Sequence, residues 1–234
     1  MKKISISIFS VLFALVVSST NLTAGSIGLG VSGAFMNVEA DGKETEATVS
    51  GVTSETTKKS VDNNAFIGSI FGEYSFANVS YANSGVTFGI RYTPGSADVS
   101  DKVHSRTDSA VATSAGGAEN DTGTYKAQAQ VENYINYYLD IPLFSSVYVK
   151  AGWAQIDVIT QESATSTTIG SYGDATLDGI NYGLGVKGEN GNVIWKLAYE
   201  VTNFDTLNLT SSTSNKIKAD LDTSEVNISV GYKF

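Results

Sequence analysis

The stretch from Tyr125 to Ile141 reads YKAQAQVENYINYYLDI. Its odd-numbered residues are apolar except for Asn133, and its even-numbered residues are mostly polar, with Lys126, Glu132 and Asp140 among them. Successive side chains point to opposite faces of a strand, whereas the helical period would mix the two sets. The stretch therefore predicts a long β-strand with one apolar and one polar face.

The same alternation recurs in further segments along the chain, so that eight strands are predicted in all. The others run from Ser26 to Val38, Ala65 to Phe76, Val86 to Thr93, Val147 to about Asp157, Leu177 to Lys187, Val193 to Thr202 and Glu225 to Phe234. After Gln155 the alternation shifts to Ile156 and Val158, which predicts a bulge there.

The connections between these segments alternate in length. Long polar stretches occupy 39–64, 94–123, 161–176 and 205–222, and shorter ones occupy 77–85, 142–146 and 188–192. Short turns at one end and long loops at the other are typical of transmembrane β-barrels, whose long loops face the outside of the cell.

Two of the short connections predict a register. The sequence Glu189-Asn190-Gly191-Asn192 is typical of a two-residue hairpin centred on Asn190-Gly191. That register places Val186 opposite Trp195, two apolar residues, so turn chemistry and hydrophobic pattern agree. A turn centred near Ala82 would likewise set Glu73 opposite Arg91, and we expect these two to form an ion pair.

Charge placement separates a membrane barrel from a soluble sandwich. The apolar faces of the eight segments contain no Asp, Glu, Lys or Arg, and the ionisable residues fall on the opposite faces. An outer band that meets lipid excludes charges, and aromatic residues such as Trp153, Trp195 and Tyr199 would supply its interfacial girdles. The pattern predicts an all-β fold, a closed antiparallel up-and-down transmembrane β-barrel of eight strands.

The beginning of the chain has the features of a secretory signal peptide. Lys2 and Lys3 precede an apolar run from Ile4 to Val17, and small and polar residues follow as far as Ala24. We therefore assign residues 1–24 to a signal peptide and residues 25–234 to the barrel domain. The chain has no cysteine, and its formal net charge of −9 argues against nucleic acid as a partner.

The last strand carries a second signal. Val226, Ile228, Val230, Tyr232 and Phe234 alternate to the final residue. Here the chain resembles the small outer-membrane barrel family that includes the OmpA transmembrane domain, OmpX and the opacity-type adhesins. The resemblance implies location in the outer membrane of a Gram-negative bacterium, among lipid and lipopolysaccharide. It also implies that Val230, Tyr232 and Phe234 form the signal read by the barrel assembly machinery.

Three apparent motifs have simpler explanations. Two stretches, starting at Gly28 and Gly183, match the dinucleotide fingerprint but lie within strands, where the fingerprint requires a strand followed by a helix. His104 is the single histidine and lies in a long polar loop, so we expect neither a catalytic site nor a histidine-rich metal site. Acidic pairs such as Asp98 with Asp101 lack calcium-loop spacing, and no cofactor is expected.

Charged residues on the polar faces are expected to meet inside the barrel. Eight strands leave an interior that side chains fill, so these charges would neutralise one another as a plug. The alternative is a gated, narrow passage. The residues of this predicted network are Glu73, Arg91, Glu132, Lys150, Lys196 and Glu200.

The sequence thus favours a structural or surface-interaction protein that is adhesin-like and not an enzyme. It would act through four long loops, whose length and polarity do not identify an external ligand. The alternatives are a narrow porin-like channel or transporter of small or hydrophobic solutes and, more remotely, a lipid-modifying enzyme or protease of the outer membrane.

Overall fold

The computed structural model describes residues 25–45, 56–81, 84–108, 111–112, 118–119, 123–144, 146–164, 171–212 and 214–234. The predicted signal peptide, residues 1–24, lies outside this part of the chain. In the described residues, no helix has the length and apolar character needed to cross a lipid bilayer.

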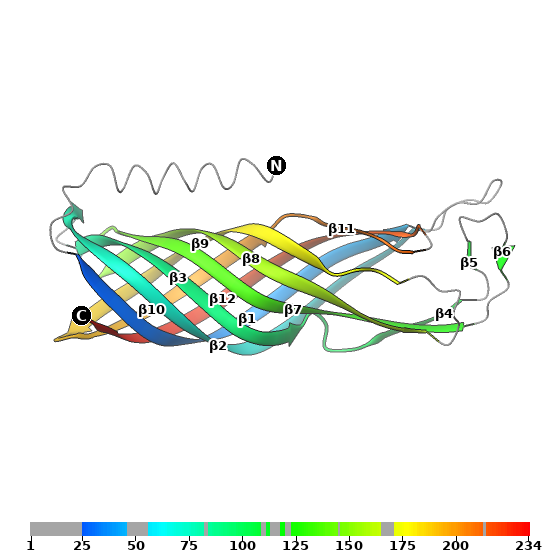
Figure 1. Cartoon of the computed structure of the whole chain (residues 1–234), viewed down its shortest axis with the longest axis horizontal. Helices are drawn as coiled ribbons and strands as arrows, with labels where there is room; N and C mark the ends of the chain where they lie inside the picture. The colour runs from blue at the N-terminus through cyan, green and yellow to red at the C-terminus, as the bar shows by residue number, and fades with distance from the viewer. Residues whose placement is uncertain are drawn as a thin grey trace.

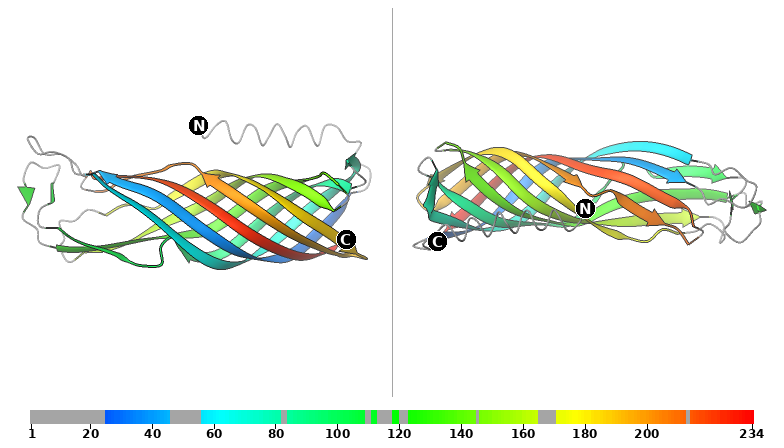
Figure 2. Two further views of the ribbon diagram at one scale, coloured as in Figure 1. Left: turned by 180° about the vertical axis from the view of Figure 1, so that it is seen from behind. Right: turned by 90° about the horizontal axis from the view of Figure 1, so that it is seen from above.

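Eight long strands form a closed antiparallel ring (Figures 1 and 2). Each pairs with its neighbour along the chain, and the first pairs with the last along most of its length, from Gly28 opposite Lys233 to Thr45 opposite Lys216. The predicted all-β, eight-stranded barrel is confirmed. The strands are β1 (Ser26–Thr45), β2 (Thr56–Tyr81), β3 (Ser84–Asp98), β7 (Gly123–Pro142), β8 (Val147–Ala164), β9 (Ala175–Asn190), β10 (Val193–Phe204) and β12 (Lys216–Lys233).

Four short strands lie towards the end of the barrel with the long connections, which we call the upper end. β4 (His104–Asp108) pairs with β7, and β11 (Leu207–Thr210) pairs with β12. β5 (Val111–Ala112) and β6 (Ala118–Glu119) pair with each other. The C-terminus lies at the opposite, lower end, where the short turns are (Figure 1).

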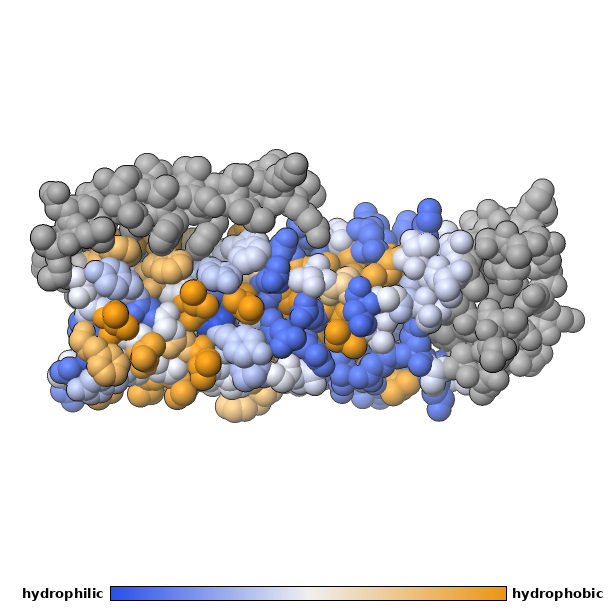
Figure 3. Space-filling model, viewed as in Figure 1, coloured by the Kyte–Doolittle hydropathy of each residue, from blue (hydrophilic) through white to orange (hydrophobic). Residues whose placement is uncertain are grey.

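The lower half of the barrel is apolar outside and polar inside. Its exposed apolar side chains form what we call the apolar belt, seen as orange residues that gather in the left half of Figure 3. An apolar outer surface of this kind fits the hydrocarbon interior of a lipid bilayer. The belt includes Ile27, Leu29, Val31, Phe35, Phe66, Ile70, Ile90, Ile180, Tyr182, Leu184, Trp195, Leu197, Tyr199, Val226, Ile228, Val230 and Tyr232.

In the upper half this pattern is inverted, although the strands continue without interruption. On β1, Met36 and Val38 are buried while Glu39 and Asp41 are exposed. Buried apolar side chains from seven strands and the segment after β3 form an upper core. Its members are Met36, Val38, Val99, Val131, Tyr134, Ala154, Ile156, Val158, Leu177, Phe204, Leu207 and Leu221. The upper half is therefore built like a water-soluble barrel.

The inversion explains why the alternation shifts after Gln155. The predicted bulge at that point of β8 is wrong, because β8 pairs with β9 in unbroken register from Val147 to Val158. Ile156 and Val158 point into the upper core. The irregularity lies on the facing strand β7, where Asn133 has a positive φ of 52° and the register shifts between Glu132 and Ile135.

Both predicted registers differ from the observed ones. The hairpin between β9 and β10 has Gly191 and Asn192 as its two loop residues, with Gly191 at φ 60°. A positive φ at the first loop position is typical of a type II′ turn, for which glycine is the favoured residue. Leu184 therefore faces Tyr199, and the shift of two residues leaves every side chain on its predicted face.

Between β2 and β3 the difference comes from an irregularity between Ser75 and Ser80. The extra β2 residues in this irregularity move the register, so that Glu73 faces Gly89 and Arg91 faces Phe71. The expected ion pair between Glu73 and Arg91 is therefore wrong.

The pairing of β2 with β3 stops at Ile70 and Tyr92, well below the top of β2. Continued register would set Gly68 opposite Pro94, which has no N–H to donate. Beyond this point the two segments are joined by side chains: Ser69 bonds Thr93 at 2.7 Å, and Asn63 Nδ2 donates to the Asp98 carbonyl at 2.8 Å. We call this part of the wall the seam.

Candidate functional site: the lumen network

Seven ionisable side chains from six strands meet inside the lower half of the barrel. We call them the lumen network: Glu73, Arg91, Asp140, Lys150, Lys196, Glu200 and Glu225. All are buried, with Glu200 and Asp140 fully inaccessible to solvent. They lie on the inner face because each strand of the belt turns its alternate, polar residues away from lipid.

The pairs join into one continuous chain. Arg91 binds both Glu225 and Glu200, the second at 3.2 Å. Lys150 Nζ then lies 2.6 Å from Glu200 and 4.0 Å from Asp140. Lys196 closes the chain by binding Asp140 at 2.7 Å and Glu73.

Aromatic side chains support the cations of the lumen network. Tyr138 donates its hydroxyl to Glu73 at 3.1 Å, and Lys150 Nζ lies 4.2 Å from the centre of the Tyr138 ring. The Arg91 guanidinium lies 5.8 Å from the centre of the Tyr134 ring, on the side of the upper core. Cations over ring faces gain electrostatic stabilisation, most of all when they are shielded from water.

The structure brings five of the six predicted network residues together: Glu73, Arg91, Lys150, Lys196 and Glu200. It does not bring Glu132 to them. Glu132 precedes the bulge at Asn133, is only partly buried and faces Asp157 in the upper half. Sequence reasoning missed Asp140 and Glu225 as members, although both lie on the polar parity of their strands.

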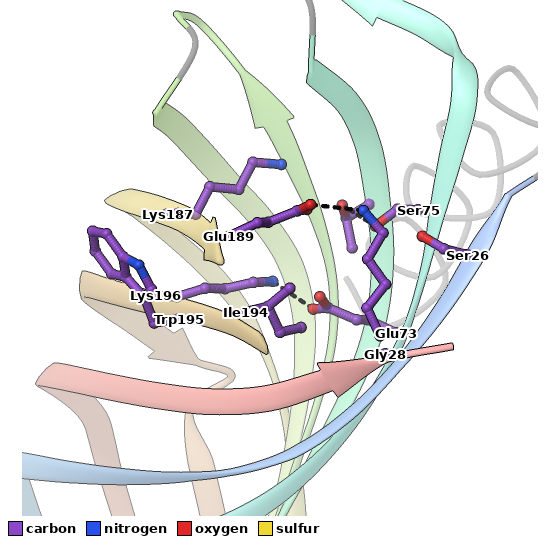
Figure 4. A pocket seen from close by; sticks show the side chains of 12 residues that line it. Ser26, Gly28, Glu73, Ser75, Lys187, Glu189, Ile194, Trp195 and Lys196 are labelled. Atoms are coloured by element: carbon purple, nitrogen blue, oxygen red, sulfur yellow. Dashed lines mark hydrogen bonds and ion pairs between the residues drawn. The ribbon is translucent and has the colours of Figure 1, made fainter. Parts of the chain in front are cut away.

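A small recess lies below the lumen network. Figure 4 shows the recess at the lower end, with Lys196 pointing to Glu73 and with Lys187, Glu189 and Ser26 on its walls. Its volume is about 20 Å³, little more than one water molecule needs. The recess lies directly beside the ion pair of Lys196 with Glu73 at the lower end of the lumen network.

The C-terminal residues lie on the outer face at the lower end. Val230, Tyr232 and Phe234 are exposed, the rings of Tyr232 and Phe234 are 5.0 Å apart edge to face, and the Phe234 N–H donates to the Ile27 carbonyl at 2.8 Å. All three residues of the predicted assembly signal are thus exposed on the last strand.

We expect that replacing Tyr232 and Phe234 by serine leaves export intact but strongly reduces insertion, because the aromatic pair is removed from the strand end. Quantitative immunoblots of outer-membrane fractions, with and without boiling, measure the folded barrel. The matched control is Lys233→Ser between them. Wild-type amounts of heat-modifiable barrel in the double variant would contradict the assignment.

The structure also locates the remaining sequence motifs. A Cβ on Gly30 would come within 2.4 Å of the Val230 carbonyl oxygen, so glycine permits close approach of β1 and β12 there.

His104 lies beside Ser100, with Nε2 and Oγ 3.2 Å apart. Its partial burial and the nearby Lys59 lower the pKa of its imidazole. In the described part of the chain, no group of three or more His, Cys, Asp or Glu side chains is placed to hold a metal ion.

A closed ring of eight antiparallel strands, apolar outside and ionic inside, is the fold of outer-membrane β-barrel proteins. No family model and no curated protein matches the chain.

Solved structures that match include the outer-membrane protein OprG from Pseudomonas aeruginosa, at 16% identity and a TM-score of 0.42, over 90% of this chain and 96% of that one. The attachment invasion locus protein Ail of Yersinia pestis matches at 13% identity and 0.37, over 90% and 97%. The outer-membrane protease OmpT from Escherichia coli matches at 8% and 0.44, over 92% and 99%. At these identities the likeness concerns the fold and assigns no activity.

Proposed function

We propose that this protein is a closed surface barrel of the Gram-negative outer membrane that acts by interaction, adhesin-like, through its upper end, and that it is neither a channel nor an enzyme. The observation that carries the proposal is the lumen network, a continuous chain of buried ion pairs that joins six of the eight strands. Opening a path would require buried charges to exchange partners, which is costly in a low-dielectric interior.

The upper half supports an interactive role. On β1, strand structure continues from Asn37 above the belt to Thr45. With the usual rise and tilt of barrel strands, this raises the loops by roughly 20 Å above the lipid boundary. The outer face of this upper half carries charged residues such as Glu39, Asp41 and Lys43. A rigid, polar support of this kind presents loops to large partners.

The proposal includes the surroundings of the barrel. Lipid and lipopolysaccharide would cover the apolar belt, and the barrel assembly machinery would insert the chain by its terminal strand. Membership of the family that includes the OmpA transmembrane domain, OmpX and the opacity-type adhesins is part of the same proposal, supported by the eight-strand ring and the terminal alternation.

Two measurements test this function. In planar bilayers the purified barrel is expected to give no conductance steps above those of protein-free bilayers. Cells that display the barrel are expected to adhere to one another and to coated surfaces more than cells displaying a variant in which residues 109–122 are replaced by a short Gly-Ser segment. Reproducible conductance steps would contradict the closed lumen. Equal adherence of the two strains would contradict the interactive role.

The alternative, a narrow porin-like channel or transporter, predicts the opposite result in the bilayer experiment. The variant Lys150→Ala, measured in the same bilayer experiment, shows whether weakening the lumen network opens a conducting path. If a weakened network still gives no steps, the closed state does not depend on one ion pair.

A further inference from the structure

The upper half of the barrel contains a partly open cavity of about 230 Å³, which we call the chamber. Its walls are almost entirely aliphatic, from β2, β8, β9, β11 and β12 among others. Val61, Val158, Leu177, Leu209 and Leu221 supply much of this surface. Apolar walls of this kind do not hold water well, because water needs polar partners.

The space exists because small residues point into it from three strands. Ala40 and Gly42 lie on β1, Ala127 and Ala129 on β7, and Ala219 on β12. Leucine or phenylalanine at these positions would fill the chamber, as large side chains fill most protein interiors. The residue choice thus maintains an apolar space in a half of the barrel that otherwise has a packed core.

The chamber also has a few polar lining residues, and the upper core continues from it towards the lumen network. Tyr134 and Phe204 do not line the chamber but belong to the same upper core as Leu177 and Leu221; their rings pack edge to face at 6.1 Å, and Arg91 of the lumen network lies against the Tyr134 ring. The polar residues that line the chamber are Lys59, Ser100, His104, Gln128, Thr160 and Glu162. An occupant would therefore meet apolar walls and a few polar side chains.

The chamber borders the seam. Lys59 and Val61 line it from β2, and Val99 and His104 line it from the segment beyond β3. The wall between these segments is joined by the side chains of Asn63 and Ser69 without a continuous main-chain ladder. A molecule that enters here separates no paired strands.

From these observations we propose that the chamber binds a small apolar molecule from outside the cell: a single hydrocarbon body with at most one polar end. A cavity of about 150 Å³ takes benzene, so 230 Å³ takes roughly nine carbon atoms. The lumen network below closes the barrel, so the molecule is held and is not passed to the lower end. This site goes beyond the loop-mediated function proposed above.

The probe for the test is 1-octanol, titrated into the folded barrel in lipid nanodiscs with ¹³C-labelled Leu and Val methyl groups. Methyl shifts of Leu177, Leu221 and Val158 are expected to saturate. Those of Leu29 and Leu184, which face lipid, are expected to change only in proportion to the octanol dissolved in the bilayer. The matched probe 1,8-octanediol, polar at both ends, is expected to bind at least tenfold more weakly.

Filling the chamber tests the location. Ala129→Phe is expected to abolish the saturable shifts, whereas Ser60→Phe, which adds the same ring to the exposed outer face of β2, leaves them unchanged. Ala219→Leu is the milder substitution should the phenylalanine variant not fold. The proposal is overturned if chamber methyls follow the same straight line as lipid-facing ones, or if the filled, folded variants keep saturable binding.

Discussion

Replacing Arg91 by alanine is expected to lower the free energy of unfolding by about 3 to 5 kcal/mol, because the structure pairs this buried guanidinium with both Glu200 and Glu225. Glu200 keeps Lys150 as a partner, but Glu225 loses its cation. Urea titrations of the barrel in lipid vesicles measure the loss. The control Lys102→Ala breaks an exposed contact with Asp101 at 3.7 Å, and a change below about 1 kcal/mol is expected there.

A double-mutant cycle then identifies the partner of Arg91. Coupling above about 1 kcal/mol is expected between Arg91 and Glu225, and clearly less between Arg91 and Glu73, which the structure pairs with Lys196. Changing Arg91 to methionine together with Glu225 to leucine is expected to destabilise less than the arginine change alone, because no unpaired charge remains. Stronger coupling to Glu73 than to Glu225 would refute the observed register.

Leu184→Arg is expected to lower the free energy of unfolding by about 2 to 4 kcal/mol, since Leu184 lies in the apolar belt and is 55% exposed. Ser60→Arg is the matched control. It also adds an arginine to an exposed position of the outer face, but above the belt and opposite Asp41, so little change is expected. Unfolding titrations in vesicles compare the two, and equal losses would place the lipid boundary elsewhere.

The neighbouring Gly185 is not a suitable control for Leu184. A Cβ at this position would come within 2.5 Å of the Tyr148 ring and hydroxyl, so even serine would displace a buried tyrosine. The inner face of the belt thus leaves no room for a larger residue at this position.

The sequence predicts the lower half well because both physical signals agree there. Lipid requires an apolar outer face and the narrow lumen takes the alternate residues, so parity alone locates Glu73, Arg91, Lys150, Lys196 and Glu200 on the inside. The partners are less predictable. They depend on register, and a shift of two residues, as at Gly191, changes every pair without moving any side chain to the other face.

The upper half was not predicted, and the reason is also physical. Above the belt, the outer face meets water and the interior becomes apolar, so the alternation keeps its period but exchanges its faces. A search for apolar outward residues therefore ends the strands too early, at Val38 on β1 and near Asp157 on β8, where the structure continues to Thr45 and Ala164. Ile156 and Val158 carry the signal of this exchange, but in the sequence alone their shifted alternation is also typical of a bulge.

The seam has a consequence for the order in which the barrel comes apart. The first and last strands, whose pairing closes the ring, are paired from Gly28 to Thr45 of β1, whereas β2 and β3 share a ladder only below Ile70 and Tyr92. We therefore expect fraying to start between two neighbouring strands, at the upper ends of β2 and β3, and not where the first strand meets the last. The closing joint of this barrel is among its strongest, and the hairpin formed by two consecutive strands is its weak one.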